Sequence, residues 1–111
     1  GEVLWASGTY GNPGAYYAMQ DDGNFVIYSA SDEALWSSET YGNPGATLNM
    51  QDDGNLVIYS ASGEVLWASG TYGNPGAYYV MQDDGNFVIY TNRGTENLTG
   101  KINETSESSS P

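Results

Sequence analysis

A nine-residue phrase, repeated three times at a spacing of 31 residues, limits the possible folds of this chain more than any other feature. It reads QDDGNFVIY from Gln20, QDDGNLVIY from Gln51 and QDDGNFVIY from Gln82. The residues before each phrase repeat as well, which defines three units, 1–31, 32–62 and 63–93. A unit of this size is one supersecondary element that cannot bury its own apolar face. We therefore expect the units to pack together as one domain over residues 1–93.

Each unit is predicted to be β-structure throughout. Tyr, Trp, Val, Ile and Thr gather in short runs that Gly, Pro, Asn and Asp separate, and this pattern is typical of strands and turns. In the first unit the runs predict strands over 3–7, 15–20 and 24–29. Three such units favour three antiparallel sheets with pseudo-threefold symmetry, because a propeller normally needs at least about four blades.

The turn between the last two strands of a unit decides which side chains share a face. A three-residue loop with Gly23 in the left-handed conformation is a common hairpin type, and it pairs Gln20 with Asn24. One face then carries Tyr16, Gln20, Asn24, Val26 and Tyr28, with Asp22 at the loop tip. The opposite face, expected to be core, carries Tyr17, Met19, Phe25 and Ile27. A two-residue loop would mix polar and core residues on one side, so the hydrophobic pattern favours the longer loop.

The same division predicts the core of the other two units. Its members are Leu48, Met50, Leu56 and Ile58 in the second unit and Tyr79, Met81, Phe87 and Ile89 in the third. One tryptophan per unit, at Trp5, Trp36 and Trp67, is predicted to lie near the threefold axis. Burial of such aromatics contributes on the order of 2–3 kcal/mol each. Stacking on a sugar is the alternative role for them.

Composition excludes several classes of function. The formal net charge of -12 opposes binding to nucleic acid or to an anionic membrane, and no apolar run is long enough for membrane insertion. The chain has no Cys and no His, so thiolate metal sites and histidine acid–base chemistry are excluded. No cofactor is expected.

The acidic hairpin tip has two other interpretations. The Asp-Asp-Gly-Asn stretch resembles part of a calcium loop, but a strand follows where the remaining ligands would be needed. The adjacent carboxylates Asp21 and Asp22 could serve a glycosidase. On a hairpin tip they point apart and stay solvated, so their pKa values would not be split as catalysis requires. The chain is therefore predicted not to be an enzyme.

The motif Gln-x-Asp-x-Asn-x-Val-x-Tyr resembles the signature of the monocot mannose-binding, or bulb-type, lectins of the snowdrop-lectin kind. It is complete three times, at Gln20, Asp22, Asn24, Val26, Tyr28; at Gln51, Asp53, Asn55, Val57, Tyr59; and at Gln82, Asp84, Asn86, Val88, Tyr90. The resemblance implies an all-β fold of the β-prism II type, with three four-stranded sheets, one mannose site per sheet and no metal. The fourth strand of each sheet would then lie near Thr9-Tyr10 and its counterparts.

Residue roles also follow from the resemblance. In the first unit it implies that Asp22 and Asn24 bind the axial 2-hydroxyl of mannose, Gln20 the 3-hydroxyl and Tyr28 the 4-hydroxyl, while Val26 packs on the ring carbons. The matching residues of the other units would act alike. The implied function is a lectin with three equivalent sites for α-mannose or mannose-rich glycans and glycoproteins. The alternatives are a structural or adhesive β-repeat protein without a ligand, or the targeting module of an antimicrobial protein.

The order of the strands departs from the family. Here the Leu-Trp strand stands first, over 3–7, and none follows the third hairpin. Strand 3–7 must then complete the third sheet, either within its own chain or in a neighbouring chain, and the second arrangement gives a homodimer by strand exchange.

The residues after the repeats differ in character. Residues 94–111 are rich in Ser, Thr, Glu and Asn and are predicted to be a disordered tail or linker. They contain glycosylation sequons at Asn97 and Asn103. A secreted or cell-surface location would suit a glycan-binding protein, and the sequence itself does not specify one.

Overall fold

Nine short strands and no helix make up residues 1–92, the part of the chain that the computed structural model describes. The strands are β1 (Val3–Ala6), β2 (Tyr16–Met19), β3 (Phe25–Tyr28), β4 (Ala34–Ser37), β5 (Thr47–Met50), β6 (Leu56–Tyr59), β7 (Val65–Ala68), β8 (Tyr78–Met81) and β9 (Phe87–Tyr90). The all-β prediction is confirmed, and the predicted strands of the first unit agree with β1 to β3 to within one residue at each end. The predicted tail with Asn97 and Asn103 lies outside the described residues.

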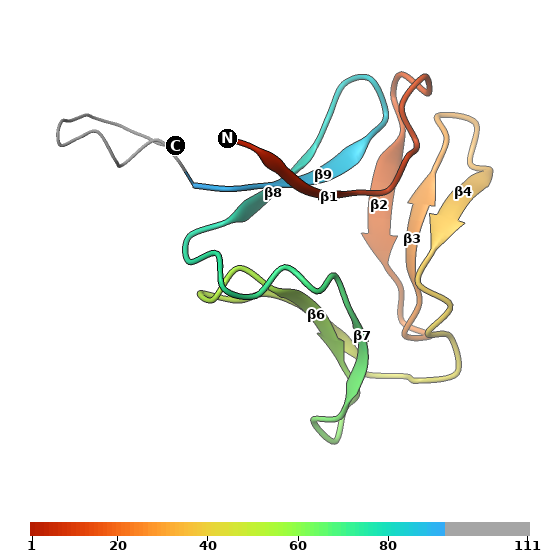
Figure 1. The fold of residues 1–111 in the computed structure, drawn as a ribbon. Coiled ribbons are helices and arrows are strands. Elements are labelled where there is room, and N and C mark those ends of the chain that lie inside the picture. The colour runs from red at the N-terminus through yellow and green to blue at the C-terminus, as the bar shows by residue number, and fades with distance from the viewer. Residues whose placement is uncertain (93–111) are drawn as a thin grey trace, which may run out of the picture.

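The strands form three antiparallel three-stranded sheets, in the orders β2-β3-β4, β5-β6-β7 and β1-β9-β8 (Figure 1). Each sheet joins the hairpin of one sequence unit to the first strand of another unit. The N-terminal strand β1 pairs with β9 of its own chain, with Trp5 opposite Ile89. The ring of sheets is therefore closed within one molecule.

The four-stranded sheets that the resemblance implies are not formed within residues 1–92. The segment proposed as a fourth strand, Thr9-Tyr10, lies between Gly8 and Gly11, whose φ angles are 78° and 83°. These left-handed residues turn the chain, so it cannot continue as an extended strand.

The hairpin register predicted from the sequence is confirmed. Tyr16 lies opposite Tyr28 and Ala18 opposite Val26. The backbone N–H of Gln20 donates to the carbonyl of Asn24 at 2.9 Å, which continues the pairing to the edge of the three-residue loop. The same register recurs in the second and third hairpins. Polar signature side chains therefore stand on one face of each sheet and the core on the other.

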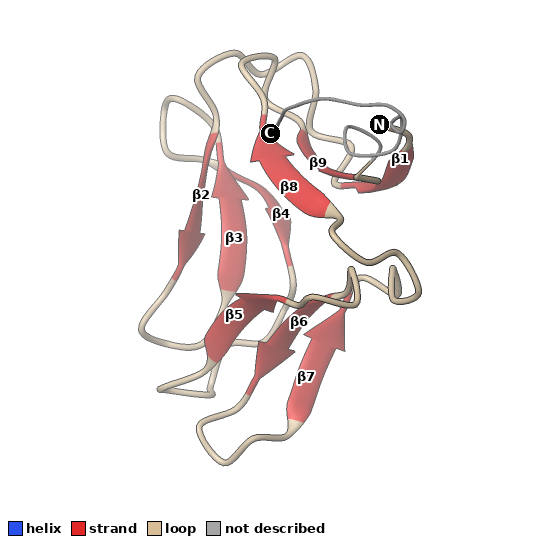
Figure 2. Ribbon diagram, turned by 90° about the vertical axis from the view of Figure 1, so that its left-hand side faces the viewer, coloured by secondary structure: helices blue, strands red, loops and turns tan. Residues whose placement is uncertain are grey.

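The core lies between the three sheets (Figure 2). Its fully buried members are Phe25, Ile27, Leu56, Ile58, Phe87 and Ile89, each 0% exposed. The three tryptophans meet edge to face at centroid distances of 5.4–5.5 Å, which confirms their predicted place at the centre. An irregularity in each Leu-Trp strand, such as that at Leu35, lets two consecutive residues pack against the core.

One predicted core residue is more exposed than the others. Tyr17 faces inward and its ring contacts Phe25 and Phe87, yet it remains 37% exposed because β2 is an edge strand. Its hydroxyl lies 3.1 Å from that of Tyr79. This hydrogen bond, with burial and the neighbouring hydroxyl charge, raises the pKa of Tyr79 to about 12. The second unit has leucine at the matching position, so the pair joins only two of the sheets.

A turn of the next unit packs closely against each hairpin tip, and glycine permits the approach. Gly23 has a φ of 92°, and a Cβ built there would lie 2.3 Å from the carbonyl oxygen of Asn43. Gly42, in that same turn, has a φ of 82° but no atom within 4 Å of its Cβ position. Both positions therefore favour glycine for its left-handed backbone conformation. Only Gly23 must also lack a side chain, because a Cβ there would overlap the turn at Asn43.

We expect Gly23→Ala to destabilise the protein by several kcal/mol, because the turn at Asn43 must move away. The matched control Gly42→Ala should cost only about 1–2 kcal/mol, for the left-handed conformation alone. Urea unfolding of the two variants measures the difference. Equal losses would show that the close approach at Gly23 is unimportant.

Candidate functional site

The five signature side chains of each unit come together on the outer face of their sheet, as the sequence predicts. In the first unit Asp22 is exposed, and Gln20, Asn24 and Tyr28 are half-buried. Val26 lies at the centre of the group between Ala18 of β2 and Ser37 of β4. It is only 3% exposed, so the valine expected to pack on the ring carbons of a sugar is covered in this structure.

A contact between two signature residues spans the face on which that valine lies. The side-chain amide of Gln20 donates to the hydroxyl of Tyr28, and the two residues stand on either side of Val26 along the hairpin. The same bridge forms from Gln51 to Tyr59 and from Gln82 to Tyr90. A ligand that separates the bridge gains access to the valine and exchanges one hydrogen bond for others.

The orientation of Asn24 is set by donors from the next unit. Its Oδ1 accepts from the backbone N–H of Thr40 at 3.1 Å and from the Ser37 hydroxyl at 2.9 Å. A backbone N–H can only donate, so the atom that faces it must be the oxygen. The Nδ2 group consequently points away from these donors and has no partner among residues 1–92. Asn24 therefore offers donors to a ligand.

Asp22, next to Asn24, offers a hydrogen-bond acceptor. Its Oδ1 accepts from the backbone N–H of Asn24 at 2.9 Å, which fixes the carboxylate at the hairpin tip. The second oxygen remains as an acceptor at an exposed position. Asp53 and Asp84 make the same contact in the other units. Each site thus presents a charged acceptor and an amide donor side by side.

Three residues that sequence reasoning missed support this arrangement. Thr40 is 6% exposed and donates from Oγ1 to the carbonyl of Gly23 at 2.5 Å. Ser38 bonds the backbone N–H of Phe25, and the N–H of Asn43 donates to the carbonyl of Asp22 at 3.0 Å. The signal was present, because these Ser, Thr and Asn positions are identical in all three units, at 7, 9 and 12, at 38, 40 and 43, and at 69, 71 and 74.

The surroundings of the three sites are not identical. The ring of Tyr16 stacks on that of Tyr28 at a centroid distance of 5.5 Å, and the ring of Tyr78 lies tilted against that of Tyr90 at 5.9 Å. In the second site Thr47 stands opposite Tyr59 instead. Tyr16 also donates from its hydroxyl to Asp32 at 2.6 Å. This hydrogen bond, with desolvation and the nearby charge, raises the pKa of Tyr16.

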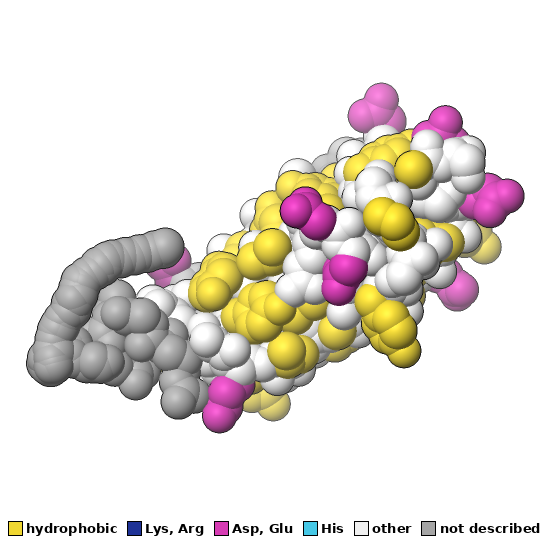
Figure 3. All heavy atoms as spheres, turned by 90° about the horizontal axis from the view of Figure 1, so that it is seen from above, with side chains coloured by type: hydrophobic (Ala, Val, Ile, Leu, Met, Phe, Trp, Pro, Cys, Tyr) yellow, Lys and Arg dark blue, Asp and Glu magenta, His cyan; other side chains and the backbone are white. Residues whose placement is uncertain are grey.

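The charged side chains around the sites are all acidic. Figure 3 shows Asp and Glu side chains scattered over one face, and residues 1–92 contain no Lys, Arg or His. No group of three or more acidic side chains within residues 1–92 is placed to hold a metal ion. None of the described residues belongs to a helix of the length and apolarity that a membrane crossing needs. Hydrogen bonding to a neutral, hydroxyl-bearing ligand is the chemistry that such a face supports.

The chain is similar to several lectins of known structure. Neither a protein-family model nor a curated protein matches it. Among solved structures it is similar to the lectin of Polygonatum cyrtonema in complex with monomannoside, with 36% identity over 79% of this chain and 81% of that one and a TM-score of 0.68. The mannose-specific agglutinin from snowdrop (Galanthus nivalis), in complex with methyl α-D-mannoside, is 34% identical over 87% of this chain and 97% of that one, with a TM-score of 0.67.

A third similar structure comes from Gastrodia elata. The monomeric monocot mannose-binding lectins of Gastrodia elata are 45% identical to the chain over 72% of its length and 71% of theirs, with a TM-score of 0.65.

The hydrogen bond from Tyr16 to Asp32 can be tested by titration. Asp32 has a φ of 73°, and Gly63 occupies the matching position of the third unit, so Asp32→Gly should fold normally. We expect the pKa of Tyr16 to fall in this variant, because the carboxylate that stabilises the protonated hydroxyl is removed. NMR of ring carbons against pH measures it. Asp32→Asn, which keeps an acceptor but not the charge, separates the two causes, and an unchanged pKa in both variants would contradict the assignment.

Proposed function

The chain belongs to the monocot mannose-binding, or bulb-type, lectin family, and from this membership we propose that it acts as a carbohydrate-binding lectin with three sites for α-linked mannose. The three antiparallel sheets agree with the β-prism II architecture expected of the family. The observation that carries the proposal is the outward pairing of a carboxylate acceptor at Asp22 with an amide donor at Asn24.

This pair suits the axial 2-hydroxyl of mannose. A hydroxyl donates one hydrogen bond and accepts others, so it can donate to the free oxygen of Asp22 while it accepts from Nδ2 of Asn24. A bond to an ionised carboxylate is among the stronger hydrogen bonds. In glucose the 2-hydroxyl is equatorial and misses the pair, which leaves both protein groups without a ligand partner. The site should therefore discriminate between the two sugars.

The other signature residues complete the site. We assign Gln20 to the 3-hydroxyl and Tyr28 to the 4-hydroxyl. Their mutual contact supports the assignment, because it places the two polar groups next to each other on the outer face. The valine would then pack on the C–H groups of the ring. The same roles fall to Gln51, Asp53, Asn55, Val57 and Tyr59 in the second site, and to Gln82, Asp84, Asn86, Val88 and Tyr90 in the third.

Multivalency gives such a lectin its useful affinity. A shallow site that binds one sugar ring typically has a dissociation constant of about 1 mM, or roughly -4 kcal/mol. Three sites on one rigid prism can engage a mannose-rich glycan or glycoprotein together, and the second and third contacts then occur at high effective concentration.

We propose no catalysis at these sites. Asp21 and Asp22 are both exposed on a hairpin tip, where a carboxylate has neither the burial nor the paired partner that acid–base catalysis uses. The alternative of a structural repeat without a ligand is not favoured, because the similar structures are those of mannose-binding lectins.

Titration with methyl α-mannoside tests the proposal. We expect saturable binding of about three equivalents per chain, weaker binding of the glucose analogue, and loss of binding in the triple variant Asn24→Ala, Asn55→Ala, Asn86→Ala. Isothermal calorimetry at high protein concentration measures all three. The control is Ser62→Ala, since the Ser62 side chain bonds only Ser60, in the turn after β6, and lies outside the signature. Equal affinity for mannose and glucose would contradict the role given to Asp22 and Asn24.

Light scattering tests the oligomeric state. Because β1 pairs with β9 of its own chain, we expect a monomer at micromolar concentration. A homodimer would instead support exchange of strand 3–7 between two chains, since the same pairing can form between molecules.

A further inference from the structure

Three tyrosines with largely exposed rings stand beside the three sites. Tyr10, Tyr41 and Tyr72 occupy matching positions in the three units and are 67–68% exposed, more than any other large hydrophobic residue in the described part of the chain. The signature does not include them. Neither the packing of the core nor the pairing of the strands requires an aromatic side chain at these positions.

The backbone of each of these tyrosines is held firmly although its ring is free. The residue before Tyr41 is buried Thr40, which bonds both Gly23 and Asn24. Two residues after it, Asn43 bonds the carbonyl of Asp22 through its N–H and the carbonyl of Thr40 through Nδ2. The turns at Tyr10 and Tyr72 are held in the same way. The ring therefore projects from a fixed point and needs little ordering before it can bind.

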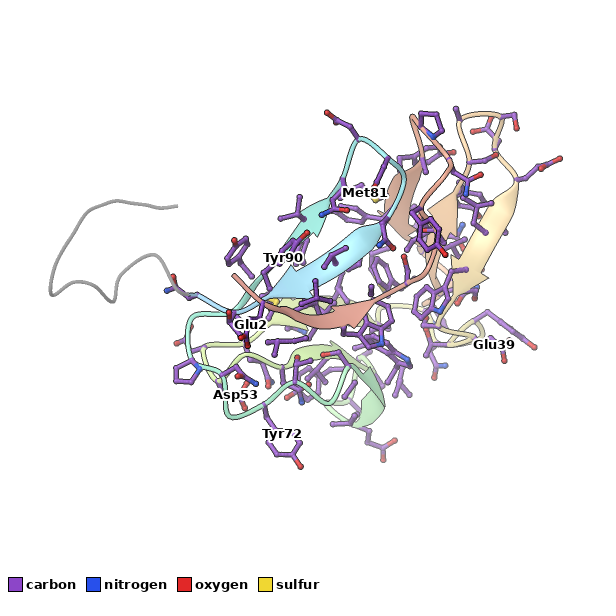
Figure 4. All side chains as sticks on the ribbon, turned by 45° about the horizontal axis from the view of Figure 1, so that its top comes forward. Glu2, Glu39, Asp53, Tyr72, Met81 and Tyr90 are labelled. Carbon is purple, nitrogen blue, oxygen red and sulfur yellow. The ribbon has the colours of Figure 1, made fainter. Side chains whose placement is uncertain are left out.

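The fixed point lies at one particular end of each site. The residues that flank Tyr41 in sequence bond Asn24 and Asp22, the donor and the acceptor at the hairpin tip. Tyr28 lies at the other end of the site. Figure 4 shows the same arrangement in the second site, where Asp53 and Tyr72 lie on adjoining loops and the ring of Tyr72 projects outward.

The stereochemistry of the bound sugar determines which part of a glycan would lie beside these tyrosine rings. If Asp22 and Asn24 hold the 2-hydroxyl and Tyr28 the 4-hydroxyl, the anomeric carbon lies beyond the hairpin-tip end, because it is the ring neighbour of the carbon that bears the 2-hydroxyl. Any group attached at the anomeric oxygen leaves the site on that side. In a mannose-rich glycan this group is the next sugar ring.

We propose that Tyr10, Tyr41 and Tyr72 each form a second subsite, which stacks on the sugar that is α-linked to the mannose in the adjoining signature site. This inference rests on the proposed function and extends it from a single mannose to a disaccharide unit. A tyrosine ring can cover the C–H face of a hexose and leave its hydroxyls in water. The acidic surroundings do not oppose such a ligand, because a neutral sugar carries no charge.

The test compares two triple variants with the natural chain. In one, Tyr10, Tyr41 and Tyr72 are all replaced by Ala, and in the other all three are replaced by Phe. Affinities are measured by calorimetry for methyl α-mannoside and for the methyl glycosides of (1→2)-, (1→3)- and (1→6)-linked α-mannobiose. Far-ultraviolet circular dichroism checks the fold, which should persist because the rings are exposed.

We expect the natural chain and the Phe variant to bind at least one mannobioside about fivefold more tightly than methyl α-mannoside, a gain typical of one aromatic contact. In the Ala variant this preference should disappear while the affinity for methyl α-mannoside is unchanged. A mannobioside has two mannose rings, and either ring could enter a signature site in every variant. A preference that the Phe variant keeps and the Ala variant loses therefore reports the aromatic ring and not the second mannose.

Failure of this inference differs from failure of the proposed function. If the natural chain binds methyl α-mannoside but shows no preference for any mannobioside, or if the Ala variant keeps that preference, the second subsite is disproved and the lectin function remains. If the natural chain binds none of these sugars, the proposed function itself is wrong.

Discussion

Docking of each turn onto the hairpin tip of another unit is the interaction on which both the fold and the sites depend. The N–H groups of Asn12, Asn43 and Asn74 donate to Asp84, Asp22 and Asp53, each at 3.0 Å. Because the first unit docks on the third, these bonds run around a closed ring. Glycine at each tip admits the turn, since a side chain at Gly23, Gly54 or Gly85 would overlap the docked backbone. The close approach then brings further donors within reach of the signature asparagine.

Each candidate site is consequently shared between two units. Gln20, Asp22, Asn24 and Tyr28 come from the first unit, but the groups that orient Asn24 come from the second. A single unit could fold into a hairpin without fixing the polarity of its asparagine side chain. Pre-organisation of this kind lowers the entropic cost of binding, so the closed ring contributes directly to recognition.

The sequence alone was sufficient for the hairpin register, because an alternating pattern leaves one loop length that separates polar from apolar residues. It also indicated the tryptophan cluster. It could not predict the bridge over Val26, which depends on how two long side chains meet across a face. It could not decide whether strand 3–7 closes its own ring, because the same hydrogen bonds form within or between chains. The supporting Ser, Thr and Asn residues were visible as repeats, but their partners depend on contacts between units.

The middle unit shows how the docking tolerates change. Glu39 adopts a φ of 60° at the position that Gly8 and Gly70 occupy in the other units. The N–H groups of Gly8 and Gly70 donate to Oδ1 of Asn86 and Asn55, the counterparts of Asn24, at 3.0 Å. The N–H of Glu39 instead donates to the hydroxyl of Ser37. That hydroxyl in turn donates to Asn24 at 2.9 Å, and the other units have alanine at its position. A serine thus replaces the donor that the backbone no longer supplies. Asn24 keeps the same orientation as its two counterparts because its oxygen, half-buried beneath the turn, would be costly to leave without donors.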